Sequence, residues 1–358
     1  MIDISTLASA YTAQNGDLLF GTGDQDTHIS IADGATVIFH GINITDVSND
    51  KNWSGVTCLG SANIVLSGTN TVWGYNFFYP GIYVPRGKTL TISGDGTLNA
   101  SSTQYTGGVA SPGGNAAGIG AGSGKDSYLG SCGTIRILSG TIVAIGGYQS
   151  AGIGGSQGSE PATSCTCDGI EILGGSVTAT GGGDAAGIGG GRNYYGRCKG
   201  DIIISGGTVI AQGGNNGAGI GSGIGHDEEP ESPVYGNIII TGGTVTATGG
   251  NNIVALVIPA GIGCGEGDED DDKKTICGDI IITNGVTKVI AAKYAKTDGS
   301  WCVGKCTSFK SICGTIRVCC TYNEGTGTYE GGYTNADGFG DNYKSWNYIP
   351  PADPSCSM

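Results

Sequence analysis

Cysteine is the reactive side chain that recurs most regularly in this sequence, which contains 13 of them. Several stand just ahead of a repeated aliphatic segment, and Cys167 lies close to the same position. If successive copies of that segment stack, their Cα atoms come within about 5 Å, a separation that a disulfide tolerates. Cys277 and Cys313 form the best adjacent pair for such a crosslink. The cysteines ahead of the segment are Cys132, Cys198, Cys277 and Cys313.

A metal centre is the alternative use of these thiols. The runs "CVGKC" and "CTC" lack the paired CxxC spacing of a zinc site, and no histidine lies near them in the sequence. The odd number of cysteines also leaves at least one thiol unpaired or joined to another molecule. Structural thiols and disulfides are therefore the first interpretation.

The stretch "GEGDEDDDKK" at 265–274 offers carboxylates to a hard cation. Asp268, Asp270 and Asp272 have the alternate spacing of the first ligands in a calcium loop. Lys273, however, stands where such a loop needs glycine, and no glutamate occupies the twelfth position. A solvated charged loop is the main interpretation. We expect no cofactor, with weak Ca²⁺ binding at these three carboxylates as the alternative.

Aromatic side chains gather in two short stretches. The run "WGYNFFYPGIY" at 73–83 is one, and "NYYG" at 193–196 is the other. Tyrosine and tryptophan rings present a flat apolar face with a polar edge, which suits the CH face of a sugar ring. The alternative is that these rings pack their own loops against the rest of the fold. The candidate carbohydrate-binding residues are Trp73, Tyr75, Tyr194 and Tyr195.

A repeat of about 33 residues must position all of these groups. An "AGIG" motif recurs, and its isoleucines are separated by 34, 35, 32 and 42 residues. The chain contains 71 glycines, and there is no collagen-like period. A fixed period in this range is typical of a solenoid. The isoleucines are Ile119, Ile153, Ile188, Ile220 and Ile262.

Each repeat also contains two β-branched segments that read as strands, such as "GDIIISGG" at 200–207 followed by "VIAQGG" at 209–214. Because side chains alternate along a strand, Ile202 and Ile204 point to the interior and Ile203 points outward. The same alternation turns two later isoleucines outward, which makes an apolar stripe. This stripe is either covered by a long loop or is a face for self-association. Its residues are Ile203, Ile239 and Ile281.

Three strands per repeat predict an all-β fold, a single-stranded parallel β-helix of about nine coils. Right-handed winding is expected because parallel crossovers are nearly always right-handed. The pattern covers residues 28–320. Residues 1–27 and 321–358 fall outside it, and we expect them to be caps over the open ends of the solenoid.

The charge and the polar columns limit the function. A net charge of −14 argues against nucleic acid and anionic membranes as partners, and no apolar run is long enough to span a bilayer. Asp201, Asn237 and Asp279 begin equivalent strands, which indicates a ladder that caps turns rather than an acid/base pair. Clustered carboxylates would be needed for a polysaccharide lyase or glycoside hydrolase.

The progression "GVTCLGSANIVLSGTNTV", "GKTLTISGDGTLNAS", "AGIGGG" and "GDIIISGGTVIAQGG" resembles the Gly-rich β-helix modules of bacterial cell-surface proteins, over roughly residues 1–350. Such modules are often described as carbohydrate-binding or adhesin-like. The resemblance implies a noncatalytic, secreted or cell-surface rod whose partners are glycans or other cell-surface and matrix components. A polysaccharide-degrading enzyme and a structural spacer or filament subunit are the alternatives.

Overall fold

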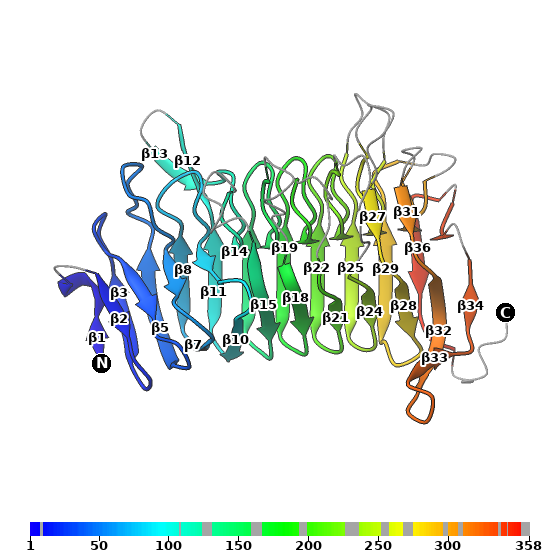
Figure 1. The fold of residues 1–358 in the computed structure, drawn as a ribbon, viewed down its shortest axis with the longest axis horizontal. Coiled ribbons are helices and arrows are strands. Elements are labelled where there is room, and N and C mark those ends of the chain that lie inside the picture. Colours follow the sequence, from blue (N-terminus) through cyan, green and yellow to red (C-terminus); the bar gives the residue numbers. More distant parts are fainter. Residues whose placement is uncertain are drawn as a thin grey trace.

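The computed structural model describes residues 1–7, 10–106, 109–123, 131–158, 167–192, 199–225, 236–251, 258–267, 275–295, 300–306, 311–335, 338–341 and 343–351. Within these ranges the structure is built from β-strands, with one short 3₁₀ turn, η1 (Ile4–Thr6). No helix in the described part of the chain is long and apolar enough to cross a membrane. The coils stack along one long axis, with the N-terminal end at one extremity and the C-terminal end at the other (Figure 1).

The first wall of the solenoid contains the "DIII"-type segments, and its strands pair in parallel from coil to coil. Ile202 pairs in register with Ile170 on one side and with Ile238 on the other. Ile202 is 2% exposed and Ile204 is fully buried, so the predicted inward ladder is confirmed. The wall contains β7 (Ala62–Ser67), β10 (Thr89–Gly94), β15 (Cys132–Ile137), β18 (Cys167–Ile172), β21 (Ile202–Ile204), β24 (Ile238–Ile240), β28 (Ile280–Thr283) and β32 (Ile316–Asn323).

The second wall follows each first-wall strand after a tight Gly-containing turn. Val209 is buried and pairs with Val177 and Val245, which continues the aliphatic lining. Asn70 interrupts the same column, and its Oδ1 accepts hydrogen bonds from the backbone of Gly41 and Ile42. The strands are β8 (Thr69–Trp73), β11 (Thr97–Ser101), β16 (Thr141–Ile145), β19 (Ser176–Thr180), β22 (Thr208–Gln212), β25 (Thr244–Thr248) and β29 (Lys288–Ala292).

The third wall contains the "AGIG" motifs, whose isoleucines are fully buried. The glycine after each isoleucine has a positive φ; in Gly189 it is +130°. A Cβ on Gly189 would lie 2.1 Å from the carbonyl oxygen of Gly221 in the next coil, so only glycine fits. The strands are β2 (Tyr11–Ala13), β4 (Ile29–Ile31), β6 (Val56–Cys58), β9 (Ile82–Tyr83), β14 (Ile119–Gly120), β17 (Ile153–Gly154), β20 (Ile188–Gly189), β23 (Ile220–Gly221), β26 (Ile262–Gly263) and β30 (Val303–Gly304).

The solenoid begins earlier than predicted, because residues 1–27 do not form a separate cap. Strand β2 pairs in parallel with β4, and β3 (Leu18–Thr22) pairs in parallel with β5 (Thr36–Ile44). These segments lack the Gly-rich motif and were therefore missed, although they already wind as a coil. Among the described residues, β1 (Ile2–Asp3) and η1 precede this coil; β1 pairs in parallel with β3, and Ile4 of η1 is buried against the core.

The C-terminal segment meets the last coils with antiparallel strands, which end the parallel stack. β33 (Thr328–Glu330) and β34 (Tyr333–Thr334) pair with β32, while β35 (Gly338–Phe339) pairs with β30 and β36 (Ser345–Tyr348) pairs with β29. This arrangement covers free strand edges that would otherwise be open to another chain. The remaining strands are β12 (Thr103–Thr106), β13 (Val109–Pro112), β27 (Thr275–Cys277) and β31 (Ser311–Cys313).

Candidate functional site

Tyr75, one of the predicted sugar-binding residues, is a core residue in this structure. Its side chain is fully buried, and its hydroxyl donates to the backbone carbonyls of Asp24 and Thr27. Burial also raises the pKa of the Tyr75 phenol. A ring with no open face cannot stack on a ligand, so this placement argues against Tyr75 as a sugar contact. It matches the alternative in which the ring packs its own loop.

Neighbouring rings complete this internal aromatic cluster. The rings of Trp53 and His28 stack with centroids 4.6 Å apart, and the Trp53 ring lies 5.3 Å from that of Tyr75. Lys51 Nζ lies 5.5 Å from the centroid of Trp53. Burial lowers the pKa of His28, which keeps this imidazole neutral over a wider pH range. The cluster stabilises the loops of the N-terminal coils.

Trp73 is placed differently, because it is partly exposed at the end of β8 and alternates with the buried Val72. In the strand register, Trp73 lies opposite Ser101, and Ser101 lies opposite Ile145. The predicted residues Tyr194 and Tyr195 lie outside the described residues. Within the described part of the chain, Trp73 is therefore the one predicted carbohydrate-contact residue that is partly exposed, and its ring also packs against the core.

Tyr148 is an exposed aromatic residue at the same corner that sequence analysis missed. It follows Ile145 by three residues and is 61% exposed. Its ring lies over Gly183 of the next coil, because a Cβ on Gly183 would be only 3.0 Å from Cε2 of Tyr148. The sequence does contain a feature that could have identified Tyr148. When "GGYQSAGIG" is aligned with "GGGDAAGIG", tyrosine stands where the next repeat has glycine in the turn.

Backbone and side-chain hydrogen bonds hold this turn between its neighbours. The Tyr148 amide donates to the Gly114 carbonyl at 2.6 Å, and the Tyr148 carbonyl accepts from the Asp184 amide at 3.1 Å. Asp184 is buried, and its carboxylate accepts hydrogen bonds from Arg192 and Asn216, each at 2.8 Å. The turn that presents Tyr148 is therefore fixed by coils on both sides.

The polar column at the start of the first wall is a structural ladder, as predicted. Asp201 Oδ1 accepts from the amide of Asn237 at 2.7 Å, and Asn237 Oδ1 accepts from the amide of Asp279 at 2.9 Å. Asp279 Oδ1 then accepts from the amide of Thr315 at 2.7 Å. Each side chain thus caps the next coil. One oxygen of each carboxylate is therefore used in a hydrogen bond to the backbone of the next coil.

The outward isoleucine stripe is in direct register. Ile203 pairs with Ile239, and Ile239 pairs with Ile281. Charged residues end the stripe, since Glu171 pairs with Ile203 and Arg317 pairs with Ile281. The three side chains are half-buried. Self-association through them stays a prediction.

A second group of chemically reactive residues is formed by cysteines near the C-terminal end. Cys277 and Cys313 pair in register on β27 and β31, as expected from stacking. Both are free thiols in this structure, so the predicted disulfide between them is not formed. Cys313 Sγ instead lies 3.2 Å from Cys264 Sγ. Cys319, which the sequence did not single out, is disulfide-bonded.

The predicted Ca²⁺ ligands Asp268, Asp270 and Asp272 lie outside the described residues. Within the described part of the chain, no group of three or more His, Cys, Asp or Glu side chains is arranged to hold a metal ion. Ca²⁺ binding therefore stays a prediction.

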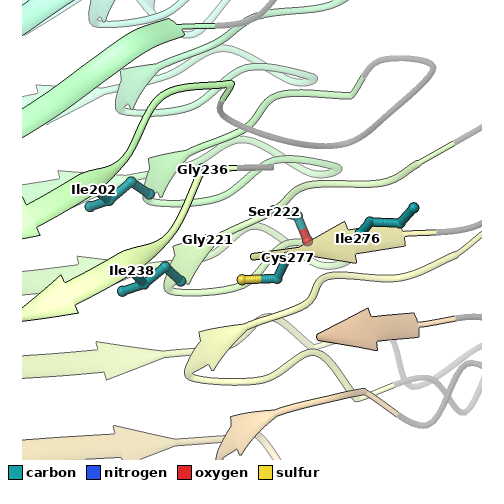
Figure 2. Close-up of a pocket in the computed structure, with 7 residues that line it drawn as sticks. All are labelled: Ile202, Gly221, Ser222, Gly236, Ile238, Ile276 and Cys277. Atoms are coloured by element: carbon teal, nitrogen blue, oxygen red, sulfur yellow. The ribbon is translucent and has the colours of Figure 1, made fainter. Parts of the chain in front are cut away.

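A small cavity between the first and third walls is too small to bind a sugar. Its volume is about 10 Å³, enough for roughly one water molecule. Ile202 and Ile238 enter it from stacked strands, and Ser222 and Cys277 line the opposite side (Figure 2). This cavity is therefore not a sugar-binding site.

Comparison with known protein families finds a beta helix repeat model that matches four segments, each starting in a first-wall strand and continuing through the third-wall strand of its coil. The matched residues are 135–158, 170–192, 202–224 and 238–266. Comparisons with curated proteins and with solved structures gave no significant match. The repeat and the stacked parallel walls together define a parallel β-helix repeat protein.

Proposed function

We propose that this chain is a noncatalytic binding module of the cell surface or extracellular space, which binds glycans or mediates adhesion through one corner of a rigid rod. The observation that carries this proposal is the exposed ring of Tyr148 on a turn fixed by both neighbouring coils. Trp73 is the second aromatic residue of this corner.

The spacing of these two rings suits an extended ligand. Trp73 lies two coil steps before Ile145, which places it about 10 Å along the rod from the strand that leads to Tyr148. Each ring offers an apolar face for a sugar ring. Since the turn is held in place before binding, little conformational entropy is lost when a ligand binds.

Polar side chains continue the Trp73 column toward the C-terminus. Thr180 and Gln212 occupy the register positions that follow Ile145, and Thr248 follows them. Gln212 is exposed, and its amide nitrogen donates to the carbonyl of Gly213 at 3.0 Å. These groups can donate and accept hydrogen bonds with sugar hydroxyls beside the aromatic contacts.

Affinity gel electrophoresis against a panel of neutral and acidic soluble polysaccharides tests this proposal. We expect at least one polysaccharide to retard the protein, and Tyr148→Ala and Trp73→Ala each to weaken binding by roughly 3- to 10-fold through loss of an aromatic contact. Tyr343→Ala is the matched control, because Tyr343 is 63% exposed near the C-terminal end.

Two results would contradict the proposal. The first is a panel in which no polysaccharide retards the protein. The second is retardation that Tyr148→Ala and Trp73→Ala leave unchanged. Release of reducing sugar from a polysaccharide that binds would instead favour the polysaccharide-degrading enzyme.

A further inference from the structure

We propose that Cys264, Cys277 and Cys313 form an oxidation site, in which a low-molecular-weight disulfide such as oxidised glutathione converts Cys264 and Cys313 to a disulfide. The proposal is independent of glycan binding. It rests on the convergence of three free thiols from three segments of the chain.

The geometry brings one sulfur within reach of two others. Cys264 follows β26, while Cys277 and Cys313 end the paired strands β27 and β31. Cys313 Sγ lies 3.2 Å from Cys264 Sγ, and Cys264 Sγ also lies 3.4 Å from the carbonyl oxygen of Ile312. A disulfide here needs the two sulfurs to close by about 1.2 Å, a small side-chain movement.

Differences in exposure decide where the oxidant enters. Cys264 is fully buried and Cys277 is 6% exposed, whereas Cys313 is half-buried. The neighbouring Ile312 is 44% exposed, so β31 lies at the surface. Cys313 is therefore the thiol that a solute meets first, and Cys264 is the thiol that completes the reaction.

The reaction proceeds by two thiol–disulfide exchanges. The Cys313 thiolate attacks one sulfur of oxidised glutathione, the S–S bond breaks, and one glutathione leaves as a thiolate that takes up a proton. Cys264 then loses its proton, its sulfur attacks Cys313 Sγ, and the second glutathione leaves. Two cysteine thiols are oxidised, and one glutathione disulfide is reduced to two thiols.

Slow formation is expected at this site. The hydrogen bond with Cys264 and burial raise the pKa of the Cys313 thiol, so little thiolate is present at neutral pH. Cys277 also contacts Cys313 by a hydrogen bond, which makes it the alternative partner when Cys264 is absent. The disulfide would crosslink the coil that contains β26 to the coil that contains β31. Its slow formation suits a structural crosslink rather than a rapid redox sensor.

Peptide mapping by mass spectrometry without reductant tests the proposal on the full chain. The protein is reduced, freed of reductant and incubated with excess oxidised glutathione. We expect a Cys264–Cys313 peptide in the wild type and in Cys277→Ser, with two titratable thiols lost in addition to those that re-form the disulfide of Cys319. In Cys264→Ser we expect Cys313 to be joined to Cys277 or to glutathione.

The crosslink should also raise the melting temperature by on the order of 5 °C, and dithiothreitol should reverse this shift. Cys58→Ser is the control, because Cys58 is buried in an early coil and burial raises its pKa to about 12. It should retain the Cys264–Cys313 peptide.

Three results would overturn the proposal. One is a wild-type protein whose Cys264 stays reduced while Cys313 is reduced or only glutathionylated. Another is a disulfide between Cys264 and a cysteine other than Cys313. The third is thiols that react only after a chelator removes a bound metal. Because the wild-type map decides between them, the test does not depend on the folding of any variant.

Discussion

Replacing Gly189 with alanine is expected to lower the free energy of unfolding by more than about 4 kcal/mol. Gly189 has a φ of +130°, a conformation that alanine rarely adopts. The new Cβ would also lie 2.1 Å from the Gly221 carbonyl oxygen and 3.1 Å from Ile202 Cδ1. Because the closer contact is with backbone, no side-chain rotation relieves it, and the coils would have to separate.

Gly87→Ala provides the matched control for this substitution. Gly87 has a positive φ of +73°, but no atom lies within 4 Å of the position that a Cβ would occupy. We expect only the conformational cost, about 1–2 kcal/mol. Urea denaturation followed by circular dichroism measures both variants. If Gly189→Ala and Gly87→Ala lowered the free energy of unfolding equally, the third-wall strands of neighbouring coils would not be in close contact.

Replacing Ile204 with alanine is expected to cost about 2–5 kcal/mol, the usual cost of a cavity in a packed core. Ile204 is fully buried and pairs in register with Ile172 and Ile240, which are also fully buried. The neighbouring coils are held apart at the strand spacing, so they cannot collapse into the space that the side chain leaves.

Ile203→Ala is the control on the same strand, one residue away. Ile203 points outward and is half-buried, so its truncation should cost less than about 1 kcal/mol. Chemical denaturation at several protein concentrations measures both variants. A loss at Ile203 as large as that at Ile204 would contradict the assignment of the two faces. A loss that grows with protein concentration would support self-association through the stripe.

The walls of the solenoid could be predicted because strand periodicity fixes which side chains face inward. A period of two places Ile202 and Ile204 inside and Ile203 outside, and the repeat then places Asp201 beside Asn237. Both features depend only on spacing along the chain. The N-terminal coil was not predicted because Tyr11–Ala13 and Leu18–Thr22 pair like the later strands but lack the "AGIG" and double-glycine motifs of the later coils.

The side chains of the turns could not be predicted in the same way. Tyr75 and Tyr148 both follow a glycine in the same turn of their coils, yet Tyr75 is fully buried and Tyr148 is exposed. The difference depends on Trp53, which packs against Tyr75 from another coil. The contact between Cys264 and Cys313 also depends on the backbone path that follows β26. The spacing of the repeat does not predict that path.

Deletion of one complete coil tests most directly whether the coils stack as equivalent units. Removing residues 201–236 joins Gly200 to Asn237, so that Asn237 takes the place of Asp201 and β24 takes the place of β21. Since each coil contacts mainly its neighbours, the shortened chain should fold cooperatively. Small-angle X-ray scattering should show a rod shorter by about 4.8 Å with an unchanged cross-section. An unfolded chain, or one whose cross-section changes, would contradict the stacking.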